Sequence, residues 1–127
     1  MVRLSIIVLF SLILTSCDLG GSSNFLLREI YSTTNGKKAV LFLKENGATS
    51  DNSLQVSILS GDQKLSKDEA GNVFTVDSNH DSTNQNRNSM NIQWISNDTL
   101  KIEYDKRLRT FIMKSNFAGI QIIYESK

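Results

Sequence analysis

Short apolar runs alternate with polar turns from residue 25 to the end of the chain, and this pattern predicts strands. From Leu54 to Ile58 every second side chain is apolar, which is the period of a strand with one buried face. The same alternation runs from Met90 to Trp94 and from Leu100 to Tyr104, around a polar turn, and predicts a hairpin. No long helical period is found in this region.

Further segments complete the expected set of strands. Lys38–Lys44 has an unbroken apolar centre, which predicts a central strand covered on both faces. The remaining expected strands are Phe25–Tyr31, Asn72–Val76, Arg109–Met113 and Gly119–Tyr124, with a turn at Ser115-Asn116 between the last two. Together they predict an all-β fold: a single small antiparallel meander, either a curled sheet or a small sandwich.

Two stretches are expected to lie outside the strands. Lys64–Ala70 is expected to form a brief helical turn or an exposed loop. Asp77–Ser89 contains thirteen residues without an aliphatic or aromatic side chain. Because such a segment cannot bury a face, we expect it to be mobile.

The first residues follow a different pattern. Met1–Arg3 is a short positive head, and the apolar stretch Leu4–Leu14 has the length of a signal-peptide core, too short for a membrane span of about 20 residues. Cys17, the only cysteine, ends the segment Leu14-Thr15-Ser16-Cys17. This segment resembles the cleavage site of bacterial lipoproteins, and the resemblance implies that Cys17 is lipidated and becomes the mature N-terminus.

This resemblance divides the chain into three parts. Residues 1–16 would be a lipoprotein signal peptide, in a helix, residues 17–24 a lipidated N-terminus with a flexible tether, and residues 25–127 the β domain. Since one acyl chain binds only marginally, two or three chains would anchor the protein to the bacterial cell membrane or envelope after export. Asp18 resembles an inner-membrane retention signal whose use varies among lineages, so the choice of membrane stays open. An ordinary secretory signal or a retained hydrophobic anchor is the alternative.

Charge and composition narrow the possible partners. The chain has 14 basic and 13 acidic residues, and loss of Arg3 with the signal peptide would balance them. A neutral chain gives no electrostatic argument for binding nucleic acid. With a single cysteine, the domain cannot form an internal disulfide.

Several segments carry a second resemblance. They are Asn35-Gly36-Lys37-Lys38-Ala39-Val40, Gly47-Ala48-Thr49, Ser53–Leu59, Gly71-Asn72-Val73-Phe74 and Trp94–Tyr104. These residues look like the core of an uncharacterised family of small membrane-anchored bacterial proteins, over roughly residues 30–125. Members often carry a cysteine where Asn46 stands and a Ser-Pro-Asp-Gly turn where Thr33-Thr34-Asn35-Gly36 stands. The family has no assigned activity, so the resemblance implies a domain and no function.

Candidate catalytic and metal-binding residues are few. His80 is the sole histidine and lies near Asp77, but a mobile loop does not hold a triad in place. The same loop mimics half of a calcium-binding loop, yet Ser82 and Asn88 stand where glycine and glutamate are required. One histidine and one acylated cysteine cannot form the usual zinc site. We therefore expect no catalytic residue, metal ligand or cofactor.

Two functions from different classes remain. The first is a non-catalytic accessory or interaction module that binds an envelope protein or a surface polymer, through an uncovered sheet edge or through loops. Gly47, Ala48 and Thr49 are expected to form a partner-contact loop, although a simple connecting turn explains them as well. The second is a small inhibitor or immunity-type lipoprotein. A hydrolytic enzyme is a more remote alternative, and the oligomeric state stays open.

Overall fold

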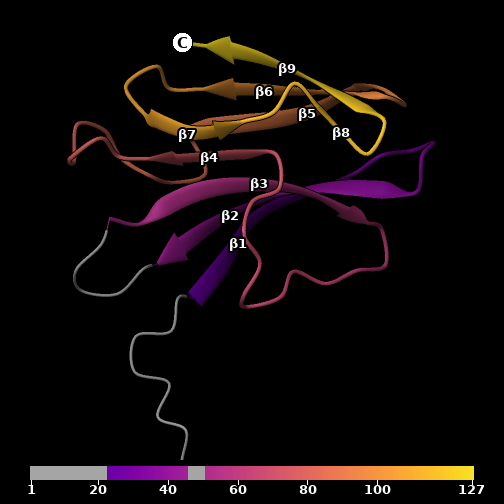
Figure 1. The fold of residues 1–127 in the computed structure, drawn as a ribbon, viewed down its shortest axis with the longest axis horizontal. Coiled ribbons are helices and arrows are strands. Elements are labelled where there is room, and N and C mark those ends of the chain that lie inside the picture. The colour runs from indigo at the N-terminus through magenta and orange to yellow at the C-terminus, as the bar shows by residue number, and fades with distance from the viewer. Residues whose placement is uncertain (1–22, 46–50) are drawn as a thin grey trace, which may run out of the picture.

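The structure is a computed structural model that describes residues 23–45 and 51–127 (Figure 1). Over these ranges the chain forms nine strands and no helix, which confirms the predicted all-β class. The expected signal-peptide helix lies outside the described residues.

The larger sheet consists of β1 (Ser23–Tyr31), β2 (Lys37–Glu45), β3 (Ser53–Ser60), β4 (Phe74–Asp77) and β7 (Arg109–Met113). Its strand order is β1-β2-β3-β4-β7, and every neighbouring pair is antiparallel. The first four strands follow chain order and form the predicted meander. β7 then adds to the free side of β4, so that β1 and β7 are the two edges of the sheet (Figure 1).

The smaller sheet consists of β5 (Met90–Ser96), β6 (Thr99–Tyr104), β8 (Asn116–Phe117) and β9 (Ile120–Ser126), in the order β5-β6-β9-β8. β5 and β6 form the predicted hairpin, with Ile92 opposite Ile102. β6 and β9 are parallel, which the sequence pattern did not predict. The chain leaves β6, forms β7 in the other sheet and crosses back, so it enters β9 in the direction of β6.

The turn expected at Ser115-Asn116 lies a few residues further along the chain. Asn116 belongs to β8, and the tight turn is formed by Ala118 and Gly119, with φ of 49° and 80°. Two consecutive residues with positive φ are what a tight hairpin turn of the right twist requires. The short β8 and this turn bring Phe117 opposite Ile120.

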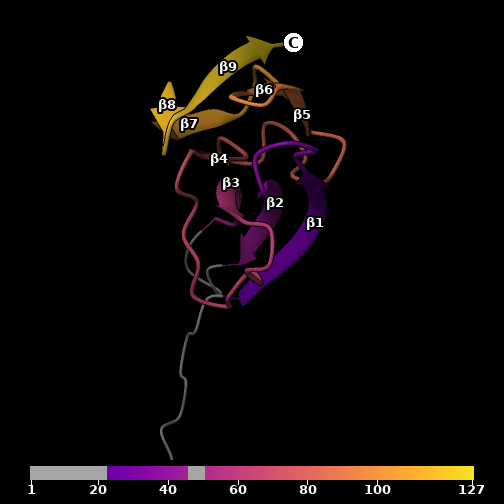
Figure 2. The same ribbon diagram turned by 90° about the vertical axis from the view of Figure 1, so that its right-hand side faces the viewer.

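One hydrophobic core lies between the two sheets, which makes the fold a sandwich and not a single curled sheet (Figure 2). Phe74 is fully buried in it and meets the rings of Tyr104 and Tyr124 at centroid distances of 5.1 and 5.0 Å. Such aromatic contacts contribute about 0.5–1.5 kcal/mol beyond their buried area. The buried core also contains Leu41, Leu54, Val56 and Val76 from the larger sheet and Ile92, Leu100, Ile102 and Ile122 from the smaller one.

β2 is buried on both faces, as predicted. Ala39 and Leu41 belong to the main core, whereas Val40 and Phe42 form a second small cluster with Leu59. The strand therefore separates two apolar layers.

β3 is also buried on both faces, which corrects the expectation of a half-buried strand. Its polar side chains are covered by the segment that leads to β4. Gln55 Oε1 accepts a hydrogen bond from the Gly71 amide, and Ser57 Oγ accepts one from the Asn72 amide at 3.1 Å. The Asn72 side chain then pairs with the backbone of Ile58 through two bonds of 2.9 and 3.0 Å. The covering segment forms turns and no helix over Lys64–Ala70.

The Asn72→Ala substitution tests this cover. It would leave the amide and carbonyl of Ile58 without their partners, and each unsatisfied buried group costs about 1–3 kcal/mol. We expect the free energy of unfolding, measured by urea denaturation, to fall by about 2–4 kcal/mol. Asn84→Ala, at an exposed position, is the control and should change it by less than about 0.5 kcal/mol. Equal effects of the two substitutions would contradict the role of Asn72.

Candidate functional site

The residues singled out from the sequence lie outside the described ranges. Cys17 belongs to the first of the undescribed segments, and Gly47, Ala48 and Thr49 belong to the second. The second segment joins β2 to β3, which pair antiparallel from Lys37↔Ser60 to Lys44↔Ser53. Lipidation at Cys17 and partner contact at the Gly47 loop therefore stay predictions.

The loop after β4 has no regular structure, as predicted, but hydrogen bonds connect it internally. The Asp77 carboxylate accepts a bond from the Asn79 amide at 2.8 Å, and Ser78 Oγ accepts one from the Asp81 amide at 3.1 Å. Asn79, His80 and Asp81 have φ of 51°, 57° and 61°. Three consecutive non-glycine residues in this region are unusual because each is strained by about 1–2 kcal/mol. The mobility of the loop stays a prediction.

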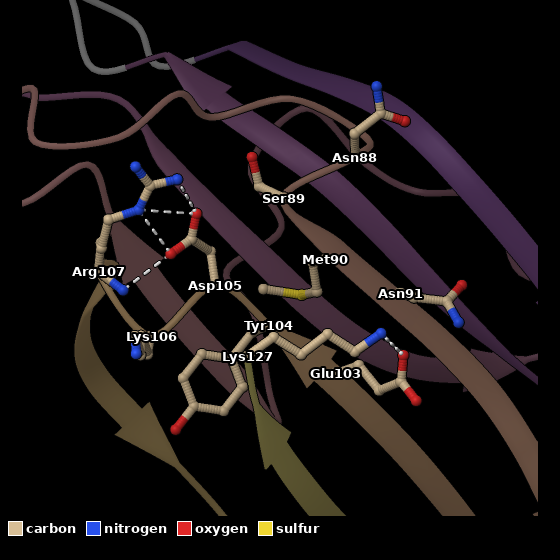
Figure 3. A pocket seen from close by; sticks show the side chains of 10 residues that line it. All are labelled: Asn88, Ser89, Met90, Asn91, Glu103, Tyr104, Asp105, Lys106, Arg107 and Lys127. Carbon is tan, nitrogen blue, oxygen red and sulfur yellow. Dashed lines mark hydrogen bonds and ion pairs between the residues drawn. The ribbon is translucent and has the colours of Figure 1, made fainter.

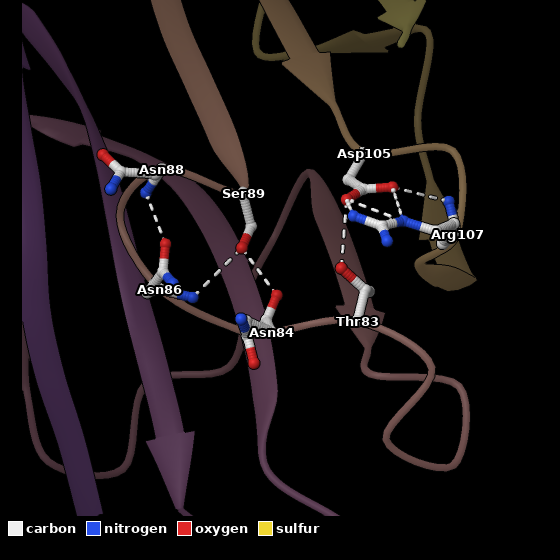
Figure 4. A network of polar contacts seen from close by, with 7 residues as sticks. All are labelled: Thr83, Asn84, Asn86, Asn88, Ser89, Asp105 and Arg107. Atoms are coloured by element: carbon white, nitrogen blue, oxygen red, sulfur yellow. Dashed lines mark hydrogen bonds and ion pairs between the residues drawn. The ribbon is translucent and has the colours of Figure 1, made fainter.

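The second half of the loop is attached to neighbouring elements (Figure 4). Thr83 Oγ1 donates to the Asp105 carboxylate at 3.0 Å, and Gln85 Nε2 donates to the Asn52 carbonyl at 2.8 Å. Ser89 Oγ donates to the carbonyl of Asn84 at 2.6 Å. The loop is thus fixed to the start of β3 and to the end of β6.

The most buried charged group of this region is Asp77, the last residue of β4, whose exposed fraction is 4%. Arg109, the first residue of β7, holds its carboxylate through Nη2 and through Nε, the latter at 3.1 Å. His80 Nε2 lies 3.3 Å from Arg109 Nη1. The acid that would orient a catalytic histidine is therefore bound to a guanidinium instead.

Two opposing effects set the pKa of Asp77. Burial alone would raise it, but the hydrogen bonds from Arg109 and from the Asn79 amide outweigh burial, so the pKa lies below its usual value. Asp77 is accordingly a charged structural link between β4 and β7.

A polar hollow of about 270 Å³ lies where the β5–β6 hairpin meets the preceding loop (Figure 3). Arg107 Nη2 is 2.6 Å from the Asp105 carboxylate, and Lys127 Nζ is 2.7 Å from that of Glu103. Arg107 also holds the pKa of Asp105 well below its usual range. The carboxylates of Asp105 and Glu103 are thus each paired with a cation, and the Ser89 hydroxyl donates to a backbone carbonyl. The hollow therefore contains hydrogen-bonding groups, but no hydroxyl in it is hydrogen-bonded to a side chain that could act as its base.

β7 presents the only run of three consecutive exposed apolar side chains among the described strands. Phe111, Ile112 and Met113 have exposed fractions of 58%, 41% and 46%. β7 has only β4 as a hydrogen-bonded neighbour, which leaves its other side open. A bulge at Phe111 interrupts the register with β4 between Thr110 and Ile112.

A groove of about 460 Å³ crosses the sheet face beside β7. The Arg109 guanidinium lies over the Phe111 ring, 5.0 Å from its centroid, at one side of the groove. Gln55 and Asp77 line it but are already bound by Gly71 and Arg109. The described residues that line the groove are Asp51, Ser53, Gln55, Thr75, Asp77, Arg109 and Phe111.

The other described sheet edges are short or partly covered, although β1 also exposes Phe25, Leu26 and Tyr31. At the β1 edge, Trp94 Nε1 donates to the Ile30 carbonyl at 3.0 Å, and Arg28 Nη1 donates to Asn91 Oδ1 at 2.6 Å. Trp94 and Asn91 belong to β5, the edge strand of the smaller sheet, so the same contacts place β5 against β1. β8 has only two residues. β7 is the described edge at which three consecutive exposed apolar side chains adjoin unpaired backbone groups, and this combination suits it to accept a further strand.

Sequence reasoning predicted the strand Arg109–Met113 but did not identify it as a binding surface. The available signal was the run of three bulky apolar residues from Phe111 to Met113, which breaks the alternation of a half-buried strand. That run is equally typical of a strand covered on both faces, and only the fold places it at an edge.

Comparison with protein-family models, with curated proteins and with solved structures finds no match. The family resemblance inferred from the sequence therefore stays a prediction. Among the described residues, no helix has the length and apolar character to cross a membrane, and no group of three potential metal ligands is found.

The pH dependence of stability tests the Asp77–Arg109 link. Since folding lowers the pKa of Asp77, its contribution is fully present above the unfolded value of about 3.9 and is lost as the pH falls through the folded value. We expect Asp77→Asn to lower the free energy of unfolding at pH 7 by about 1.5–3 kcal/mol.

The difference between the wild type and Asp77→Asn should shrink below about pH 4, as measured by urea denaturation over a pH series. Asp81→Asn, an exposed position in the same loop, should stay within about 0.5 kcal/mol of the wild type throughout. A difference for Asp77→Asn that is constant down to acid pH would contradict the assignment.

Proposed function

We propose that the protein is a non-catalytic interaction module of the bacterial cell envelope, anchored by lipid at Cys17, which binds a partner protein along the β7 edge. The observation that carries this proposal is the combination of three half-exposed apolar side chains with an open strand edge at Phe111–Met113.

An open apolar edge makes a protein that works alone prone to aggregation. Unpaired backbone groups and exposed apolar side chains together form a template for uncontrolled association, and proteins usually cover or charge such edges. Here Trp94 and Arg28 connect the second half of β1 to β5, whereas among the described residues no side-chain hydrogen bond joins β7 to the smaller sheet. A partner that adds a strand to β7 accounts for an edge of this composition.

The expected energies limit how such a partner binds. Burying one large apolar side chain fully contributes about 1.5–3 kcal/mol, so covering three half-exposed ones contributes roughly 3–4 kcal/mol. Main-chain hydrogen bonds add roughly 1 kcal/mol each, and association costs at least about 4 kcal/mol. The edge by itself supports only weak binding. A partner of useful affinity would also extend into the groove beside Phe111.

The anchor is supported by the sequence pattern alone. The positive head, the apolar core of eleven residues from Leu4 to Leu14 and the small residues before Cys17 occur in the order that lipidation requires. The folded part needs no disulfide and has its core between two sheets, which is compatible with export.

Metabolic labelling with a fatty acid tests the anchor. The wild type should incorporate label and partition with membranes, whereas Cys17→Ser should incorporate none because it lacks the acceptor sulfur. Ser22→Ala, beyond the cleavage site, is the matched control and should label like the wild type. Equal incorporation by Cys17→Ser would refute acylation at that sulfur.

Site-specific photo-crosslinking in the producing cells tests the binding surface. A photoreactive amino acid at Met113 should give a defined adduct with another protein, because this side chain lies on the open edge. The same amino acid at Gln121, an exposed position of β9 in the other sheet, is the control and should give none. Identical adduct patterns at the two positions, or no adduct at either, would contradict the β7 surface.

A further inference from the structure

We propose that the occupant of the β7 edge is an extended acidic peptide segment, in which apolar side chains alternate with aspartate or glutamate. The inference rests on the proposed function and adds the chemistry of the partner. It follows from the hydrogen-bonding direction of β7 and from the charges that flank it.

The backbone of β7 offers outward hydrogen-bonding groups at Met113. The Lys114 amide donates to the Val73 carbonyl at 3.0 Å, so it faces β4. Because successive residues of a strand turn their amides and carbonyls to opposite sides, those of Met113 face away from β4. An added peptide strand can pair there without disturbing the existing sheet.

The chain segment that contains β7 is basic, although the whole chain is nearly neutral and the groove beside β7 is lined by Asp51 and Asp77. Residues 106–114 contain four cationic side chains and no acidic one, against 14 basic and 13 acidic residues in the complete chain. Asp105 binds Arg107 and Asp77 binds Arg109. In the described part of the chain, no carboxylate lies within ion-pair distance of Lys106 or Lys114.

These two lysines lie on either side of the exposed apolar residues. Lys106 precedes β7, and Lys114 follows it, with its ammonium 5.4 Å from the centroid of the Phe117 ring. A peptide paired with β7 would place its apolar side chains against Phe111 and Ile112. Its carboxylates would neutralise the cations at the two ends of the strand, which supplies charge complementarity.

The same charges argue against a second copy of this chain as the occupant. A symmetric dimer through β7 would pair the strand with itself in antiparallel orientation. It would bring Lys106 and Lys114, whose charges no described carboxylate pairs, close to the same two lysines of the second copy. Like charges on directly opposite strands are destabilising, so an acidic partner is favoured over self-association.

Binding of two matched peptides to the purified full-length protein tests the inference. One eight-residue peptide alternates valine with glutamate, and the other alternates valine with lysine. We expect the glutamate peptide to bind about tenfold tighter or more in a fluorescence anisotropy titration, and this difference to shrink as salt is raised.

Charge reversal locates the binding site. The double variant Lys106→Glu, Lys114→Glu should weaken binding of the glutamate peptide by about tenfold or more, while Lys67→Glu, at an exposed position of the segment between β3 and β4, should change it by less than about twofold. Met113→Pro removes the outward amide while leaving the bonds to β4 in place, and should weaken binding as well. Exposed charge reversals leave the core intact, so the test does not depend on the proline variant.

Each outcome has a separate meaning. Equal affinity for the two peptides would overturn the acidic partner, and so would equal effects of the double variant Lys106→Glu, Lys114→Glu and of Lys67→Glu. In either case a defined crosslink at Met113 would still support the interaction module. Dimerisation through Met113 crosslinks, without peptide binding, would replace the acidic peptide with a second copy. Absence of peptide binding together with absence of crosslinks would overturn the proposed function itself.

Discussion

The packing of two sheets around Phe74 is the interaction on which the structure depends. This side chain is fully buried and contacts Tyr104 at the end of β6 and Tyr124 in β9, so it connects the larger sheet to both long strands at the centre of the smaller one. Tyr124 extends the link further, because its hydroxyl donates to the Lys114 carbonyl just after β7. With only one cysteine in the chain, this packing has to hold the sandwich without a disulfide.

Much of the fold could be predicted from local patterns. The alternation in β5 and β6 and the apolar run in β2 identify strands directly, because side-chain period and burial are local properties. The second buried face of β3 could not be predicted in this way. It depends on Gly71 and Asn72, which lie about fifteen residues further along the chain and cover Gln55 and Ser57. The parallel pairing of β6 with β9 escaped prediction for a related reason, since strand patterns do not encode sheet membership.

The candidate site was predictable to a smaller degree. The chemistry expected at Cys17 follows from neighbouring residues, and a local pattern suffices to propose it. The β7 surface depends on strand order: the Phe111–Met113 segment would have no open backbone edge if another strand followed it in the sheet. The pairing of Asp77 with Arg109 likewise joins residues separated by 32 positions, and it directs the acid away from His80.

The opposite placement of β1 and β7 has a consequence for a protein held by its N-terminus. These strands are the two edges of one sheet with three strands between them, which separates them by roughly 19 Å at the usual spacing of paired strands. If acyl chains restrain the residues before β1, the proposed docking edge at β7 lies on the opposite side of the sheet from the restrained strand. A partner would then reach β7 without displacing lipid headgroups. The length of the tether would set how far the domain extends from the bilayer, but it would not change whether β7 is accessible.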